Sequence, residues 1–342
     1  RNKVLPKQMA LAEKNAIEHG SSFYWVDGLV DIEKLTELSP KEIRLNTDRR
    51  KLGHLPLWLA TNHFMGEGFW FWVIPLQGIT SLGLVYDSNL IDHEKVSTPE
   101  RLCEWICEEF PLFARDLPKR KILDRGFLKS YSYGCRQTIH KSKWALSGES
   151  GRFSDPLYSP GSDFIAVHNT LIIDAILSEP NALAGKCYLY ETLARSLYES
   201  LIPTYSLSYD ALGDQETFVL KYTWELSAYF AFFVFPMIND LSTDRRFIVS
   251  YLSKFSRLGK TNENLQKFLS GYYQWKKLNP TSERAPLFHD FASIGTLREA
   301  EGTFYEVGLD PDEAKQVLNQ QLLNLQELAR YIVAYLSSIV LS

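Results

Sequence analysis

The sequence lacks a glycine-rich turn of the form G-x-G-x-x-G, which seats a dinucleotide pyrophosphate between a strand and a helix. It also lacks G-x-S-x-G, H-E-x-x-H and Walker motifs, so hydrolase, zincin and P-loop interpretations have no support. Four cysteines in 342 residues show no zinc-finger spacing. We therefore expect reduced thiols and no metal site.

Strong charge and long apolar runs are missing as well. The net charge is −4, and no basic run exceeds Lys119-Arg120-Lys121, which argues against a nucleic-acid partner. The first residues form no apolar signal region, and the most apolar stretch, Leu226 to Ile238, is shorter than the ~20 residues that span a bilayer. We expect a soluble, cytoplasmic protein without a membrane span.

Aromatic residues are abundant, at 13% of the chain, and the clearest element among them is a hairpin. Two runs rich in strand-forming residues, 69–76 and 79–86, flank Gln77-Gly78, with glycine where a two-residue loop needs a positive φ. This register pairs Trp72 with Gly83, Trp70 with Val85 and Ile74 with Ser81 on one face. Two interpretations stay open: a wall of a binding pocket, or indole packing that buries a strand glycine.

Other segments predict the surrounding elements. Strands are expected at Phe23–Val26, Leu128–Tyr133 and Trp144–Ser147. Helices are expected at 31–38, at 98–109 behind the Thr98-Pro99 start, and at 161–177, which is apolar on nearly all sides and should be buried. Beyond Pro180, helical patterns dominate, at 184–201, 215–235, 244–258, 261–277 and 311–341, with a turn-rich loop at 279–310.

The hairpin contains Trp70-Phe71-Trp72-Val73-Ile74-Pro75, which matches W-x-W-x-I-P at every specified position. This motif resembles the signature of the flavin-dependent halogenases. The resemblance implies that Trp70 and Trp72 take part in catalysis by keeping the organic substrate away from the flavin, so that halide is oxidised instead.

A second resemblance lies in Gly148-Glu149-Ser150 and in Asp155-Pro156-Leu157-Tyr158-Ser159-Pro160-Gly161. In flavoproteins of the hydroxylase and halogenase type, a strand ends in G-D-A and the chain runs through D-P-x-x-S-x-G into a helix that faces the flavin. The resemblance implies cofactor-binding roles for Glu149, Asp155, Pro156, Ser159 and Gly161. It also implies a halide site at Ser159, Pro160 and Gly161.

This chain departs from the family pattern at two positions. Glu149 stands where the family has aspartate, and its extra methylene moves the carboxylate outward. Tyr158 stands where tryptophan halogenases carry a substrate-orienting glutamate. The catalytic lysine of the family lies in the nucleotide-binding region, so no lysine of this chain is assigned that role.

Three further polar residues are weaker candidates. His63 and Glu67 precede the motif and suit a base and its orienting partner, although such residues more often satisfy backbone groups in a turn. His168 lies within the apolar helix, where a hydrogen-bonded core histidine is the more common role.

These observations predict an α+β fold that resembles the C-terminal portion of a flavin-dependent halogenase without its N-terminal G-x-G-x-x-G region. We expect a substrate-side antiparallel sheet at 1–147, a flavin-facing strand–turn–helix return at 148–180 and a helical C-terminal domain at 181–342. The resemblance implies a biosynthetic oxidoreductase that uses reduced FAD and oxygen with chloride or bromide. Its partners would be a flavin reductase, a small or carrier-tethered substrate, and a separate FAD-binding region or chain.

Two alternative functions remain open from the sequence. One is an FAD-dependent monooxygenase of the same fold, which would oxygenate its substrate directly. The other is a halogenase-like binding module without catalysis.

Overall fold

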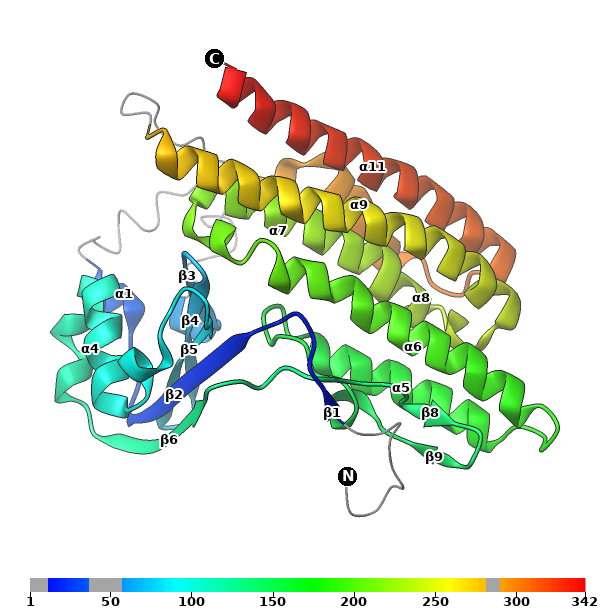
Figure 1. Ribbon diagram of the computed structural model, residues 1–342, viewed down its shortest axis with the longest axis horizontal. Helices are drawn as coiled ribbons and strands as arrows, with labels where there is room; N and C mark the ends of the chain where they lie inside the picture. Colours follow the sequence, from blue (N-terminus) through cyan, green and yellow to red (C-terminus); the bar gives the residue numbers. More distant parts are fainter. Residues whose placement is uncertain (1–11, 37–56, 281–289, 342) are drawn as a thin grey trace. The chain divides into compact units, whose positions relative to one another are not determined.

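The computed structural model describes residues 12–36, 57–280 and 290–341 and consists of two compact units (Figure 1). The sheet unit comprises Glu18–Tyr131, and the helical unit comprises Arg1–Ile17 together with Ser132–Ser342. These units begin and end at other residues than the three predicted segments. The predicted segments were defined by the role expected of each, toward substrate or flavin, and those roles stay predictions.

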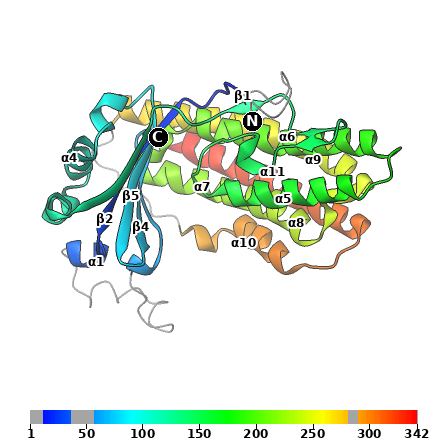
Figure 2. The same cartoon turned by 90° about the horizontal axis from the view of Figure 1, so that it is seen from below.

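The sheet unit is built on a five-stranded antiparallel sheet with strand order β3-β4-β5-β2-β6. Its strands are β2 (His19–Asp27), β3 (Asn62–Gly66), β4 (Phe69–Leu76), β5 (Ile79–Asp87) and β6 (Ile122–Leu128). Helices α1 (Ile32–Leu35) and α4 (Pro99–Glu109) belong to the same unit, and α4 lies beside β2 (Figure 2). Short helical turns of this unit are η1 (Leu57–Leu59), η2 (His93–Val96), η3 (Pro111–Arg115) and η4 (Leu117–Lys119).

The predicted hairpin is confirmed with its register. Trp72 pairs with Gly83, Trp70 with Val85 and Ile74 with Ser81. Gly78 has φ +77°, a conformation that a residue with a side chain rarely adopts. The two-residue loop therefore sets the register, and the register sets which side chains share a face.

The two faces of the sheet carry different side chains. One face forms a buried core with α4, to which β4 contributes Phe69, Phe71 and Val73 and α4 contributes Leu102 and Ile106. The indoles of the motif point to the opposite face, since side chains alternate along a strand.

The edge strand β6 corrects one prediction. A strand was expected at Leu128–Tyr133, but it lies at Ile122–Leu128 and pairs with β2. The polar residues Asp124 and Arg125 hid it, because an edge strand exposes one side to water and tolerates charge. Gly126 pairs with Phe23 of β2, and the Phe23 ring occupies the space that a side chain at position 126 would fill. This cross-strand packing explains a glycine within the strand.

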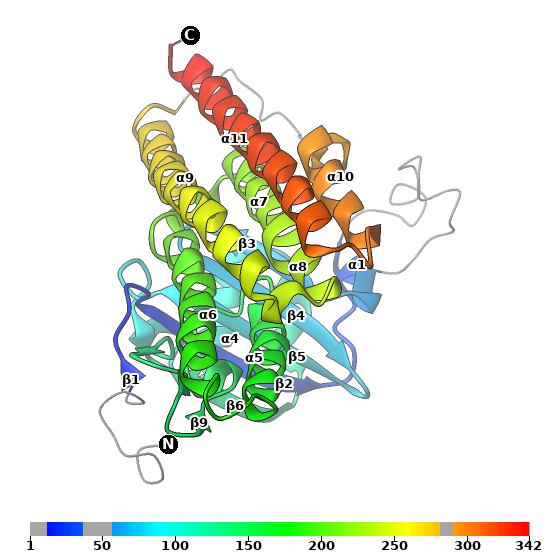
Figure 3. The same cartoon turned by 90° about the vertical axis from the view of Figure 1, so that its right-hand side faces the viewer.

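The helical unit contains α5 (Pro160–Ile176), α6 (Leu183–Ser206), α7 (Gln215–Tyr229), α8 (Phe235–Ile238), α9 (Arg245–Leu278), α10 (Gly295–Gly302) and α11 (Pro311–Leu341). Shorter elements are β1 (Ala12–Glu13), β7 (Gly134–Cys135), β8 (Ile139–His140), β9 (Trp144–Ala145) and η5 (Gly148–Ser150). Further short turns are η6 (Asp210–Gly213), η8 (Leu241–Thr243), η9 (Phe291–Ser293) and η10 (Thr303–Tyr305). Figure 3 shows the long helices α9 and α11 side by side.

Several helix boundaries differ from the sequence predictions. The segments 244–258 and 261–277 form one helix, α9, because a buried stripe continues past Gly259 through Leu258, Asn262 and Leu265. The segment 215–235 changes at Phe230–Val234 into a π-helical turn, η7, just before Pro236, which has no N–H to continue the regular pattern. The predicted loop at 279–310 contains α10, while 281–289 lie outside the described residues.

Two more expectations concern α5 and α1. The expectation that α5 is buried all round is wrong, since Ile173 is 56% exposed and Ile176 73% exposed. The helix predicted at 31–38 begins as expected behind Asp31 but ends at Leu35, because Thr36 is already extended; residues 37 and 38 lie outside the described part of the chain. No helix in the described part of the chain is long and apolar enough to cross a bilayer.

Candidate functional site

The segment 148–161 is partly buried and leads into α5. The strand expected before it is short, because β9 covers only Trp144–Ala145. After η5 the chain is held by Arg152, whose Nη2 lies 2.5 Å from Glu191 Oε1 of α6. Glu191 also accepts from the Thr138 backbone N–H at 2.7 Å and is 8% exposed. This buried ion pair is balanced by hydrogen bonds, and it fixes the approach to the turn.

Asp155 is the centre of the turn itself. Its side chain is fully buried, and its Oδ1 accepts from the Leu157 backbone N–H at 2.9 Å. Both carboxylate oxygens also accept from the Tyr209 hydroxyl, at 3.3 and 3.2 Å. These contacts shape the loop and give the Asp155 carboxylate a structural role within it. A direct contact with a cofactor stays a prediction.

Two consecutive residues after Asp155 adopt left-handed backbone conformations. Tyr158 has φ +68° and Ser159 has φ +58°. Each such residue with a side chain costs about 1–3 kcal/mol and persists where its surroundings hold it in place. Strain of this kind gathers at functional sites, and here it lies directly before the first turn of α5.

The N-terminus of α5 carries no side-chain cap. Ser159 is the N-cap residue without a side-chain hydrogen bond, and Pro160 follows at the first helical position. The first N–H groups of a helix have no intrahelical acceptor and carry partial positive charge. The exposed Glu149 carboxylate lies against Gly161, where a Cβ would overlap it. Gly161 therefore lets an anionic group approach the helix start closely.

A buried polar network, which the sequence analysis did not find, lies behind the turn. The Tyr158 hydroxyl donates to Glu225 Oε2 at 2.9 Å. Glu225 Oε1 accepts from Lys221 Nζ of the same helix, α7, and from Gln266 Nε2 of α9 at 2.9 Å. Lys221 has no exposed side-chain surface and also donates to the Thr204 carbonyl at 3.0 Å. The available signal was Lys221 and Glu225, an oppositely charged pair four residues apart on one helix face.

His168 is a core histidine, as expected for this position. It is 1% exposed, and its Nδ1 accepts from the Gly148 backbone N–H at 2.7 Å. Burial and the nearby Arg152 charge lower the pKa of His168 from 6.5 to about 4. The neutral imidazole thus holds the start of the 148–161 segment.

In the sheet unit, Trp70 and Trp72 lie next to each other with ring centroids 5.6 Å apart. Trp70 is 4% exposed, and Trp72 is half-buried with its Nε1 donating to Ser81 Oγ at 3.1 Å. A Cβ on Gly83 would overlap the Trp72 indole. The space above Gly83 is therefore filled by Trp72 itself, which supports the packing interpretation of this pair.

Of the other candidates, His63 lies opposite Trp72 on β3, and its ring centroid is 4.8 Å from that of Trp70. Partial burial against these rings lowers the pKa of His63 below its ordinary value, so it is neutral at pH 7. Glu67 follows β3 at the turn into β4.

Replacing Gly83 with valine is expected to displace the Trp72 indole and to lower the stability of the sheet unit by about 1–3 kcal/mol, as overpacking does. The indole N–H resonance of Trp72 should shift together with the urea midpoint. Ser81→Ala is the comparison: it removes the acceptor of the indole N–H and so should shift the resonance too, but it leaves the space unchanged, so the urea midpoint should fall less than in Gly83→Val. An unchanged resonance and midpoint in Gly83→Val would contradict the packing described here.

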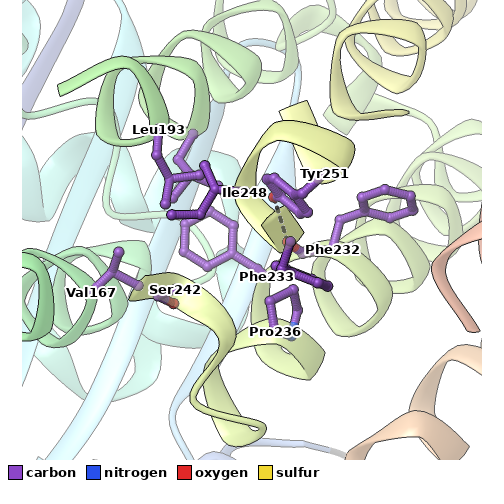
Figure 4. Close-up of a pocket in the computed structure, with 10 residues that line it drawn as sticks. Val167, Leu193, Phe232, Phe233, Pro236, Ser242, Ile248 and Tyr251 are labelled. Carbon is purple, nitrogen blue, oxygen red and sulfur yellow. Dashed lines mark hydrogen bonds between the residues drawn. The ribbon is translucent and has the colours of Figure 1, made fainter. Parts of the chain in front are cut away.

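An apolar cavity in the helical unit lies next to the π-helical turn (Figure 4). It is lined by Val167, Leu193, Leu197, Phe232, Phe233, Pro236, Ser242, Phe247, Ile248 and Tyr251. Its volume of about 20 Å³ accommodates roughly one water molecule, so it is too small for an organic substrate. Among the described residues, no group of three or more His, Cys, Asp or Glu side chains could hold a metal ion.

The structure brings one set of predicted site residues together. Glu149, Asp155, Pro156, Ser159, Pro160 and Gly161 lie in or beside the turn that starts α5. Trp70 and Trp72 belong to the sheet unit. That both sets serve one site stays a prediction.

Comparison with known proteins gives one curated relative and several similar structures, while no family model matches the chain. The relative is the flavin-dependent halogenase chlA of Dictyostelium discoideum, 26% identical over 110 residues. This match covers 31% of the present chain and 18% of chlA.

Solved structures of the halogenase PltM are similar over more of the chain. A PltM mutant in complex with FAD has a TM-score of 0.52 at 14% identity, covering 89% of this chain and 61% of PltM. PltM in complex with phloroglucinol and FAD has a TM-score of 0.51 at 13% identity, covering 94% and 61%. At such identities these matches show the fold: an antiparallel sheet and a helical region that correspond to part of PltM. The chain is thus similar to flavin-dependent halogenases over part of their length, in sequence to chlA and in fold to PltM.

Proposed function

We propose that this chain is the substrate-side and flavin-facing part of a flavin-dependent halogenase. The observation that carries the proposal is the strained turn that ends at the uncapped start of α5. It lies in the same segment that resembles the flavin-facing return of the family, and the relation to chlA and PltM supports the same assignment.

The residues fit one end of FAD. The positive end of α5 suits a bound anion or a reduced flavin ring, and the exposed Glu149 carboxylate beside Gly161 can accept from ribityl hydroxyls. In the described ranges no strand leads through a G-x-G-x-x-G turn into a helix, so the pyrophosphate has no seat there. The nucleotide end therefore requires a further region or chain.

When bound, FAD reduced by a flavin reductase supplies, with oxygen, the oxidising power that converts chloride or bromide to electrophilic halogen. The backbone around Ser159, Pro160 and Gly161 holds the anion at the positive helix end. The resemblance implies that Trp70 and Trp72 would keep the organic substrate away from the flavin, and of the two only Trp72 retains appreciable exposed surface, since Trp70 is 4% exposed. PltM has been solved with phloroglucinol, so we propose an electron-rich aromatic substrate, either free or carrier-tethered.

We expect the chain alone to bind FAD no more tightly than riboflavin, with both dissociation constants weaker than micromolar. The few hydrogen bonds near Glu149 and Gly161 contribute roughly 0.5–1.5 kcal/mol each. Immobilising a large ligand costs about 4–15 kcal/mol. Titrations followed by flavin fluorescence measure both constants.

The matched variant for this titration is Gly161→Ala, whose Cβ would overlap the Glu149 carboxylate. It should weaken both ligands equally, because both reach the site through the same isoalloxazine and ribityl end. Micromolar or tighter binding of FAD by the unmodified chain would show that a pyrophosphate site exists within it.

A product assay separates the proposed function from its alternatives. The chain is supplied with FAD, NADH, a flavin reductase, oxygen, bromide and phloroglucinol, both alone and fused to the part of PltM that it does not match. We expect brominated product from the fusion and none from the chain alone. Hydroxylated product would favour a monooxygenase, and a fusion that binds FAD without any product would favour a binding module.

A further inference from the structure

The left-handed pair Tyr158-Ser159 needs an external support, and the structure shows one. Within the turn, the Ser159 N–H donates to the Pro156 carbonyl at 2.9 Å. The Leu157 carbonyl accepts from the Tyr205 hydroxyl of α6 at 3.0 Å. The Tyr158 hydroxyl donates to the Glu225 carboxylate of α7. The turn is therefore tied to the helices behind it through its strained residue.

The acceptor of this tie is itself held in place. Glu225 Oε1 is occupied by Lys221 and Gln266, which leaves Oε2 for the Tyr158 hydroxyl. Burial, and then the charge of Glu225, raise the pKa of Tyr158 well above its ordinary value, so the hydroxyl stays protonated and donates. Lys221 is fully buried, and its contact with Oε1 holds the Glu225 carboxyl group in place.

We propose that Tyr158, Glu225 and Lys221 form a latch that sets the conformation of the turn and thereby aims the first N–H groups of α5. They are positioning residues: Tyr158 acts through the backbone of Ser159, and Glu225 and Lys221 act through Tyr158. Tyr158 stands at the position where the resembling tryptophan halogenases carry a substrate-orienting glutamate. In this chain the side chain at that position anchors the turn to Glu225 instead. The inference rests on the proposed function only for what the helix start binds.

The test compares three variants of the whole chain. Tyr158→Phe removes one hydroxyl, and the double variant Lys221→Met/Glu225→Leu removes the acceptor without leaving a buried charge. Tyr222→Phe is the matched control. Tyr222 is on α7, the helix that carries Glu225, and its ring lies 5.5 Å from the Tyr158 ring, but it is not part of the latch. Hydrogen exchange of peptides covering 155–164 is compared with exchange of α11, together with the urea midpoint.

We expect Tyr158→Phe and the double variant to speed exchange at Leu157 and Ser159 by at least about tenfold, the effect of losing one hydrogen bond to a charged group. Exchange in α11 should stay unchanged, and Tyr222→Phe should match the unmodified chain. Exchange at the unmodified rate in Tyr158→Phe, or a uniform acceleration that includes α11, would overturn the latch.

Chloride is the probe for what the helix start binds. The excess ³⁵Cl linewidth in the presence of the unmodified chain should fall toward the buffer value in Tyr158→Phe and persist in Tyr222→Phe. If the unmodified chain gives no excess linewidth, the halide part of the proposed function fails, while the exchange data still decide on the latch. Unchanged broadening in a variant with accelerated exchange would overturn the aiming role.

Discussion

Replacing Lys221 with methionine is expected to lower the free energy of unfolding of the helical unit by about 3–5 kcal/mol, because it leaves a buried carboxylate without its partner. Lys221 has no exposed surface and Glu225 is 7% exposed, so water cannot take over the lost contact. Urea unfolding followed by circular dichroism at 222 nm, which reports on the helices, measures the change.

Two comparisons make this prediction specific. Lys267→Met removes a partner of Glu263 with the same four-residue spacing, but Lys267 is 56% exposed, so we expect a loss below about 1 kcal/mol. The double variant Lys221→Met/Glu225→Leu should recover most of the stability, since Gln266 Nε2 still reaches Asn262 Oδ1 at 2.9 Å. A loss of less than about 1 kcal/mol in Lys221→Met would show that the pair is not buried as described.

The hairpin could be predicted in full because its information is local. Gln77-Gly78 sets the loop, the loop sets the register, and the register places Trp72 over Gly83. What the indole does there was not decided by the pattern. A pocket wall and a packed glycine share the same alternation of residues, and only the position of the ring separates them.

The start of α5 was predicted from its motif, whereas its supports were not. Tyr158 and Glu225 are 67 residues apart, and Arg152 and Glu191 are 39 apart. No periodicity relates positions at such separations, so contacts between them follow only from the packed helices. This is also why Asp155 was given a cofactor role from its motif, while its buried contacts with Leu157 and Tyr209 could not be foreseen.

Errors in helix and strand boundaries have a common physical origin. The sequence pattern predicted two helices, 244–258 and 261–277, but the glycine between them, Gly259, is tolerated within one helix because the buried stripe continues on both sides. Ile173 and Ile176 suggested burial, yet an apolar residue is not buried by its own hydropathy alone. In each case tertiary packing, which the local sequence does not specify, decided the outcome.

The helical unit is expected to lose roughly 3 kcal/mol of stability between pH 6.5 and pH 4 through His168, whose pKa falls from 6.5 to about 4 on folding. The folded pKa lies below the unfolded one, so the unfolded chain binds the proton first as the pH falls. The stabilisation is therefore complete above pH 6.5 and is lost as the pH approaches 4. Urea titrations at several pH values measure this slope.

His168→Gln isolates the contribution of this imidazole, because a glutamine oxygen can accept from the Gly148 N–H without titrating. Other groups, such as Asp163 with its raised pKa, titrate alike in both proteins and cancel in the difference. Protonation at Nδ1 removes the acceptor for Gly148, so the 148–161 segment should open first and its amide exchange should rise before global unfolding. If both proteins show the same slope from pH 6.5 to pH 4, the acid sensitivity lies elsewhere and His168 is not the group that holds the segment.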